Sequence, residues 1–138
     1  MNDEQLRQLA SFRHDLRQFH RYSEQACAAQ GLSTQHYQAL LALKAAGRAA
    51  PVTVSLLAQL LHIKHNSAVG LVDRMESFGL AARRPSQADR RSVVVEITAV
   101  GRQQLRRLAD AHWRELRRVA PAFLHHFGVF AQARAVRR

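Results

Sequence analysis

Apolar residues recur at three- and four-residue steps along the first part of the chain. This spacing predicts one long helix with an apolar face, because an α-helix completes a turn in about 3.6 residues. The face is made by Leu9, Phe12, Leu16, Phe19 and Ala26. Gly31 follows and predicts where the helix ends.

Two shorter helices are predicted next. Ser33 is a suitable N-cap for the first of them, and Gly47 closes it. Its apolar side is expected to carry Tyr37, Leu40, Leu41 and Lys44. A short extended stretch at Val52–Thr53 comes before the second helix, for which Ser55 is the expected N-cap.

A further helix and a hairpin complete the middle of the chain. The helix begins between Lys64 and Asn66 and ends at Gly79, with buried positions expected at Ala68, Leu71, Val72, Met75 and Phe78. Two strands are predicted, at Leu80–Arg84 and at the β-branched run Val93–Ile97. Turn-forming residues between them, 85–89, predict a hairpin.

The last third of the chain is helical again. Thr98 is the expected N-cap of a helix whose apolar stripe is Leu105, Leu108, His112, Leu116 and Val119. Pro121 predicts a break or restart of this helix, since proline removes a helical hydrogen bond. The pattern therefore indicates one mostly helical α+β domain over residues 1–138. Its terminal helices have more apolar surface than the middle part can cover, which predicts a two-fold dimer.

Charge points to the partner. The chain of 138 residues carries a net charge of +11, and residues 83–138 hold 13 basic and 4 acidic side chains. Such an excess predicts a polyanionic partner. Arginine outnumbers lysine 19 to 2, which suits bidentate contacts with phosphates and base edges, although a genome composition favouring arginine gives the same ratio.

Other classes of protein fit poorly. The chain has no apolar run of membrane-spanning length and no signal-peptide pattern, and its single cysteine fits a reducing cytoplasm. It also has no glycine-rich phosphate loop, nucleophile elbow or metal-ligand spacing, so we expect neither an enzyme nor a cofactor.

The helix before the hairpin has the chemistry of a recognition helix. Such a helix needs an apolar side for anchoring and short polar groups at its N-terminal end to meet base edges. The candidate DNA-binding residues on it are Lys64, His65, Asn66, Ser67, Gly70 and Arg74. Alternatively, Asn66 or Ser67 only caps a solvated helix.

The hairpin has the chemistry of a wing. Asp89 stands two residues before Arg91 and is expected to pair with its guanidinium and aim it into a narrow, electronegative minor groove. Arg83, Arg84 and Arg90 would then meet phosphates. The alternative is an exposed hairpin whose charges serve only solubility.

These parts, in this order, resemble the MarR family of transcriptional regulators. The resemblance covers roughly residues 8–120 and is carried by the runs 54–63 and 67–76, by Gly79-Leu80, by Asp89-Arg90-Arg91-Ser92-Val93 and by 97–102. It implies a winged helix-turn-helix over about residues 33–98, with dimerisation helices over about 1–30 and 99–138. It also implies a homodimer on pseudo-palindromic operator DNA, usually a ligand-responsive repressor. By position, Asn66, Ser67 and Gly70 face bases and Arg91 is the minor-groove arginine.

The chain departs from the family pattern in several places. His62 replaces the usual glycine of the turn, where histidine tolerates a left-handed conformation better than most residues. Gly70 replaces a side chain that often reads a base, and Leu56 and Leu60 are usually polar. The segment Gly128–Arg138 matches nothing in the family, so the last helix is expected to be short or irregular.

What the protein senses stays open. Cys27 is either a redox switch or a buried thiol, but it lies at the end of the first helix rather than at a sensing position. The eight histidines are better explained by packing or solvation than by a metal site: His112 is alone on its helix, and His125 and His126 point in different directions.

The resemblance implies a pocket for a small anionic or aromatic effector, with Arg17, His20, Arg21, His36, Tyr37 and Trp113 as candidate lining residues. Each of them could equally be core or surface.

A protein that binds nucleic acid without sequence preference, of the nucleoid or RNA-binding kind, is the main alternative. A basic surface alone binds any phosphate backbone. RNA readers usually present exposed aromatic platforms, whereas the aromatic residues here fall mostly on helical apolar stripes.

Overall fold

The computed structural model describes residues 1–89 and 91–135, with side chains described up to Gln132. It divides into two compact units, one formed by Met1–Ala26 with the chain from Ala109 onward, and one formed by Cys27–Leu108. None of the described helices is both long and apolar enough to cross a membrane.

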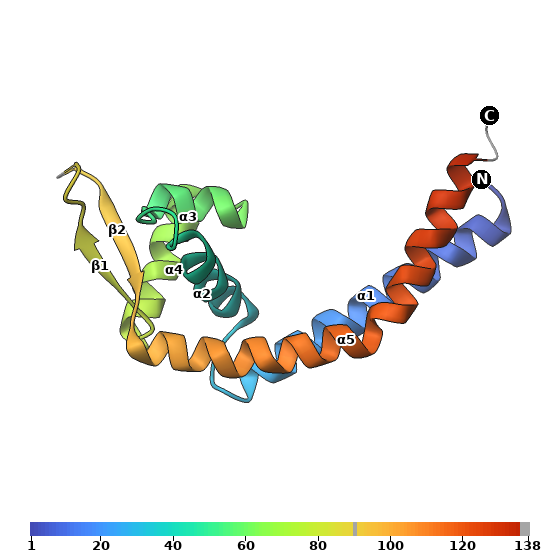
Figure 1. The fold of residues 1–138 in the computed structure, drawn as a ribbon, viewed down its shortest axis with the longest axis horizontal. Helices are drawn as coiled ribbons and strands as arrows, with labels where there is room; N and C mark the ends of the chain where they lie inside the picture. Colours follow the sequence, from blue (N-terminus) through green and yellow to red (C-terminus); the bar gives the residue numbers. More distant parts are fainter. Residues whose placement is uncertain (90, 136–138) are drawn as a thin grey trace. The chain divides into compact units, whose positions relative to one another are not determined.

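The first unit pairs α1 (Asp3–Ala28) with the greater part of α5 (Ala99–Ala135), and Figure 1 shows the two helices side by side. The Tyr22 hydroxyl donates to the Ala111 carbonyl at 3.1 Å. The Ser23 hydroxyl and the His112 ring are joined at 2.8 Å, and the Asp15 carboxylate and His126 Nε2 at 2.6 Å. One buried and two partly buried polar pairs thus hold the two helices together at several levels. A buried polar group is costly unless it is hydrogen-bonded.

The predicted break at Pro121 is wrong, and so is the irregular tail as far as Ala135; positions 136–138 of that prediction lie outside the described residues. α5 runs through Pro121 without interruption to Ala135 (Figure 1). The turns after the proline are held by α1, where the Phe12 ring lies 6.2 Å from the Phe123 ring and 5.8 Å from the Phe130 ring. Aromatic packing between Phe12 and these rings offsets the single hydrogen bond that proline removes.

The second unit contains three helices, α2 (Thr34–Ala46), α3 (Val54–Leu61) and α4 (His65–Ser77). The predicted N-cap Ser33 is confirmed: its hydroxyl accepts from His36 N at 3.2 Å, and Ser33 N donates to His36 Nδ1 at 3.1 Å. The N-cap of α3 is Thr53 rather than Ser55, since its Oγ1 accepts from the Leu56 amide. Thr53 is the last extended residue, so its hydroxyl faces the free amides of the first turn.

The turn between α3 and α4 is left-handed. His62 has φ 54° and ψ 42°, as expected for the residue that stands in place of glycine. Beyond it, α4 buries four of its five predicted core residues, namely Ala68, Leu71, Val72 and Met75. The fifth, Phe78, is 54% exposed. It lies at the C-cap, where the helical period no longer applies.

The buried face of α2 also differs from the predicted one. It consists of His36, Ala39, Leu40 and Leu43, whereas Leu41 is 44% exposed. The predicted face, with Tyr37, Leu40, Leu41 and Lys44, fits the helical period as well as the observed face does. Periodicity alone therefore cannot choose between them, and the position of the neighbouring helices decides which face is buried.

The hairpin follows α4. β1 (Ala81–Pro85) and β2 (Val93–Ile97) pair antiparallel, and a single bridge joins Thr53 to Val94. At its base, the predicted cap Thr98 accepts from Gly101 N at 3.0 Å and donates to the Gly79 carbonyl at 2.6 Å. A Cβ on Gly101 would lie 2.0 Å from the Leu80 carbonyl oxygen, so only glycine allows this close approach.

Candidate nucleic-acid interface

The N-terminal end of α4 presents exposed polar groups. Lys64 is the N-cap and makes no side-chain capping bond, and it is followed by exposed His65, Asn66 and Ser67. Neither Asn66 nor Ser67 is the N-cap, so the reading in which they only cap the helix is wrong. The first amides of a helix without a side-chain cap are open to an anion, and the helix dipole favours one there.

One turn further along α4, Arg74 covers Gly70. A Cβ at Gly70 would lie 3.5 Å from Arg74 Nη1, and Arg74 Nη2 donates to Gln35 Oε1 at 3.5 Å. The guanidinium therefore folds back along the helix over the position that lacks a side chain. Any substitution at Gly70 would compete with Arg74 for this surface.

A groove of about 380 Å³ separates the start of α3 and α4 from the hairpin. Three predicted DNA-binding residues line it, namely His65 from α4, Arg83 from β1 and Arg91 from the hairpin tip. Ser55 Oγ is 3.5 Å from His65 Nδ1. The local fold thus brings the helix end and the hairpin tip to the border of one groove.

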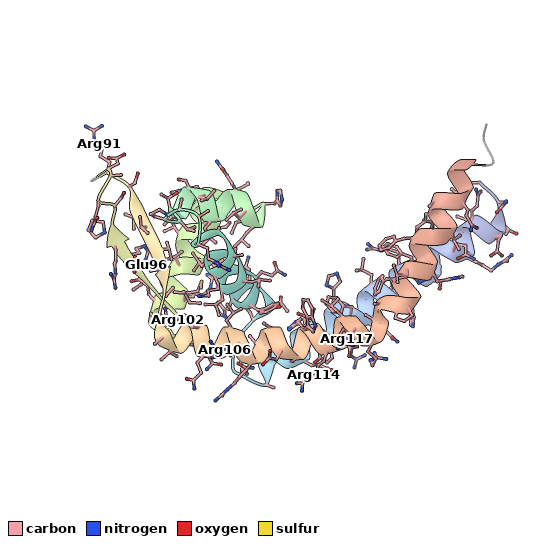
Figure 2. All side chains as sticks on the ribbon, viewed as in Figure 1. Arg91, Glu96, Arg102, Arg106, Arg114 and Arg117 are labelled. Carbon is pink, nitrogen blue, oxygen red and sulfur yellow. The ribbon has the colours of Figure 1, made fainter. Side chains whose placement is uncertain are left out.

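The turn at the tip of the hairpin corrects one expectation. The Asp89 carboxylate accepts from the backbone amide of Arg91 at 3.0 Å and from the Ser92 hydroxyl at 3.3 Å. It therefore shapes the turn instead of pairing with the Arg91 guanidinium. Figure 2 shows Arg91 at the end of the hairpin, pointing away from the rest of the unit. Arg90 lies outside the described residues.

Arg83 was expected to contact a phosphate, but its guanidinium contacts groups of α4 instead. Its Nη1 is 2.7 Å from Asp73 Oδ1 and also contacts the Glu76 carboxylate, while its Nη2 donates to the Val69 carbonyl at 3.2 Å. Both acids belong to α4, and the Arg83 side chain is only 28% exposed. We therefore assign Arg83 to the packing of β1 on α4.

Arg84 remains accessible. Its side chain is 67% exposed, and its Nε is 3.1 Å from Glu96 Oε2 across the hairpin. An exposed ion pair of this kind has little net strength, so it does not prevent a phosphate contact.

The six candidate effector residues do not gather at one site within either unit. Arg17, His20, Arg21 and Trp113 belong to the first unit, where Arg21 lines a cavity of about 410 Å³ between α1 and α5. Tyr37 and His36 belong to α2. Burial, and then the charge of Arg74, lower the pKa of His36, while burial and Cys27 raise the pKa of Tyr37.

The thiol and three of the eight imidazole groups are buried. Cys27 is fully buried, as expected for a buried thiol rather than for a redox switch. His36, His112 and His126 are buried too, whereas His125 is exposed, so the two neighbouring histidines do point in different directions. The pairs Ser23–His112, which is buried, and Asp15–His126, which is partly buried, had no signal in the sequence, because their members lie far apart in the chain. Among the described residues, no group of three or more His, Cys, Asp or Glu side chains could hold a metal ion.

Comparison with known proteins agrees with this architecture. Residues 30–92 match the family model described as MarR family. The matched segment covers α2, α3, α4 and β1 and ends just before β2. Over this segment the chain is similar to the MarR family, and its fold is the predicted winged helix-turn-helix with flanking helices.

Among curated proteins, the chain is similar to the transcriptional activatory protein BadR of Rhodopseudomonas palustris. The two are 37% identical over 83 residues, which is 60% of this chain and 47% of BadR. The match thus spans about half the length of that relative.

Solved structures show the same fold over more of the chain. AbsC, a MarR family transcriptional regulator from Streptomyces coelicolor, superposes with a TM-score of 0.79 at 20% identity, covering 99% of this chain and 91% of AbsC. A mutant MarR from E. coli complexed with operator DNA gives a TM-score of 0.67 at 19% identity, covering 77% of this chain and 74% of that one.

Proposed function

We propose that this protein is a transcriptional regulator that binds a specific sequence of double-stranded DNA as a homodimer on a pseudo-palindromic operator. One observation carries the proposal. The exposed polar start of α4 and the exposed Arg91 at the hairpin tip border the same groove of one compact unit.

Helix α4 is suited to the major groove. Its buried face fixes it to the unit through residues such as Leu71 and Met75, and its start presents Asn66 and Ser67 to solvent. Amide and hydroxyl side chains form hydrogen bonds with base edges. The proposed contacts on this helix are made by Lys64, His65, Asn66, Ser67, Gly70 and Arg74.

The hairpin is suited to the neighbouring minor groove. A turn ordered by Asp89 holds Arg91 at its end, so that little backbone freedom is lost when the arginine inserts. Exposed Arg84 is placed to bind a phosphate. Arg90 is also proposed to bind a phosphate, only because of its position in the sequence beside Arg91.

A second copy of the chain is proposed to cover the apolar surface of the first unit. Several large apolar side chains of this unit are exposed, namely Leu6, Leu9, Trp113, Leu116, Leu124 and Phe127. Exposed apolar surface of this extent is typical of an interface, and a dimer of identical chains is the commonest solution. Sedimentation of the pure protein at micromolar concentration tests this part, and a monomer would remove it.

We further propose that a small anionic or aromatic effector regulates this protein, and that the protein represses transcription. The relative BadR is a transcriptional activatory protein, so a reporter assay with and without this protein is needed to decide the direction. Reduced transcription supports repression, and increased transcription replaces it with activation.

A competition experiment separates this function from binding without sequence preference. A labelled duplex selected by the protein is challenged with an unrelated duplex, with its own separated strands and with RNA of equal length. Specific binding predicts that only the selected duplex competes efficiently, by a factor of about 10³ or more over non-specific duplex. Equal competition by all of them would favour the nucleoid or RNA-binding alternative.

A further inference from the structure

A hollow of about 500 Å³ opens on the surface of the Cys27–Leu108 unit. It is formed by the last turn of α2, the loop 47–52, strand β2 and the first turn of α5. None of its lining residues also lines the groove between α4 and the hairpin. The hollow is therefore a separate surface, which the proposed contact with the operator does not use.

Three cations from two distant segments border this hollow. Lys44 and Arg48 come from the end of α2 and the loop after it, and Arg102 comes from the start of α5. All three are exposed. Arg102 Nη1 donates to the Ile97 carbonyl at 3.1 Å, which holds its guanidinium beside β2. The apolar side chains that line the hollow are almost fully buried, so a partner meets mostly charge and backbone.

The protein does not neutralise these cations itself. Every ion pair of the described residues is made by other side chains, for example by Arg83 with Asp73. Glu96 also lines the hollow, but its Oε2 is 3.1 Å from Arg84 Nε on the neighbouring strand. The local charge is therefore positive, and an anionic partner would relieve the repulsion between the cations.

The spacing of the three cations favours a polyanion over a small anion. A small ligand is usually held by polar groups that converge in an enclosed, largely apolar pocket. Here the cations are spread over a helix end, a loop and a second helix around an open surface. A row of phosphates, with one for about every 3.4 Å along each strand of a duplex, matches such a spread. Arginine binds phosphate through two parallel hydrogen bonds.

The hollow also lies away from the DNA that the hairpin tip would contact. Arg91 is at the tip and points away from the unit, whereas Arg102 is at the foot of the hairpin (Figure 2). The five-residue strands between them span roughly 17 Å at about 3.3 Å per residue. A minor groove is only about 6 Å wide, so the phosphates beside an inserted Arg91 stay near the tip. A duplex that meets Arg102 is therefore a second one.

We propose that Lys44, Arg48 and Arg102 bind the phosphate backbone of a second DNA duplex, so that the protein on its operator holds another DNA segment. Contacts with phosphates carry no sequence information, so this second duplex is bound without sequence preference. The backbone contact does not depend on the proposed function, whereas the bridging of the operator and the second segment rests on it.

The backbone contact is tested on the free full-length protein. An unrelated duplex of about 12 base pairs, roughly one helical turn, is titrated at low salt, and backbone amide NMR shifts are followed. We expect saturable shifts in residues 44–52 and 95–97, in addition to shifts at 64–67 from the start of α4. Each set of shifts reports on its own surface, so the two contacts are measured separately.

A pair of double variants with equal charge locates the contact. Arg48→Gln combined with Arg102→Gln should weaken the binding seen at 44–52 by about fivefold or more, since two phosphate contacts are lost. Arg114→Gln combined with Arg117→Gln removes the same charge from exposed positions outside the hollow. This control should change the binding by less than about twofold.

Bridging is tested with the operator-bound protein. Beads that carry the selected operator duplex are loaded with protein, washed and offered a labelled unrelated duplex at low salt. The wild type and the control variant should retain the labelled duplex, and retention should fall steeply as salt is raised. The Arg48/Arg102 variant should load onto the beads equally well but retain at least about fivefold less of the second duplex.

Four results separate the possible failures. Absence of shifts in 44–52 and 95–97, or equal binding there by the wild type and the Arg48/Arg102 variant, would overturn the backbone contact. Loaded beads that retain no second duplex would overturn bridging and leave the proposed function intact. If no operator can be selected, the proposed function and bridging fail together, while the NMR titration still decides the contact. Displacement of the second duplex by poly-glutamate at equal charge would assign the surface to an acidic protein instead.

Discussion

The Asp89 carboxylate accepts a hydrogen bond from the backbone amide of Arg91 at 3.0 Å. An aspartate that bonds the backbone two residues ahead forms an Asx turn, which fixes the direction of the chain. The arginine side chain itself is left exposed at the end of the hairpin (Figure 2). The acid and the base of the hairpin tip therefore have separate roles, one in shaping the turn and one in contacting the partner.

Replacement of Arg91 tests the contact role. Arg91→Ala should weaken binding to the selected duplex by about 1–3 kcal/mol, because the guanidinium would lose its place in the minor groove. Fluorescence anisotropy at fixed salt measures the change, and Arg106→Ala on α5 is the matched control. Sedimentation should give the same oligomeric state for all three proteins. Unchanged affinity in Arg91→Ala would remove the hairpin from the interface.

Two substitutions of Asp89 separate the shaping of the turn from the pairing of charges. Asp89→Asn keeps an oxygen that can accept from the Arg91 amide, whereas Asp89→Ala loses it. We expect Asp89→Asn to bind DNA nearly as well as the wild type and Asp89→Ala to bind more weakly. Should both variants lose the same affinity, the negative charge would be the important feature, and the aspartate would act on the guanidinium after all.

Arg83 is predicted to stabilise the fold. Arg83→Ala removes contacts with Asp73, Glu76 and the Val69 carbonyl, and we expect it to lower the free energy of unfolding by about 1–2 kcal/mol. Arg84→Ala on the same strand, with one exposed partner, should change it by less than about 0.5 kcal/mol. Urea unfolding gives both values. The opposite order would return Arg83 to the list of residues free to meet phosphates.

His36 is predicted to make stability depend on pH. Burial and the nearby Arg74 lower its pKa below the ordinary value of 6.5, so the folded state takes up this proton less readily than the unfolded state. Its contribution is therefore complete above pH 6.5 and declines as the pH falls from there toward the lowered folded pKa. Protonation would also turn Nδ1 into a donor facing the Ser33 amide, which now donates to it.

The measurement compares urea unfolding of the wild type and of His36→Gln above and below pH 6.5. Glutamine at this position of a capping box can still accept from the N-cap amide. The wild type should lose more stability than the variant when the pH is lowered. Parallel curves for the two proteins would show that His36 does not titrate in this way.

The sequence was most informative where local chemistry decides the structure. The left-handed His62, the cap at Thr98 and the core positions Leu71 and Met75 depend on neighbouring residues, and all were predicted. The same holds for the exposed polar start of α4.

Contacts between distant segments could not be predicted in this way. Pro121 remains helical because Phe12, more than a hundred positions earlier, packs against the turns after it. Arg83 is held by acids on α4 that precede it by seven and ten residues, a pairing that only the fold of β1 onto α4 creates. Charge alone did not distinguish this arginine from exposed Arg84.

The central claim is that two copies of α4 and its hairpin read a duplex together. Selection of bound duplexes from a random pool by the purified protein tests it most directly. We predict an enriched pseudo-palindrome whose half-sites lie about 10 base pairs apart, one turn of the double helix. A pool that stays without a preferred sequence after repeated rounds would contradict the account.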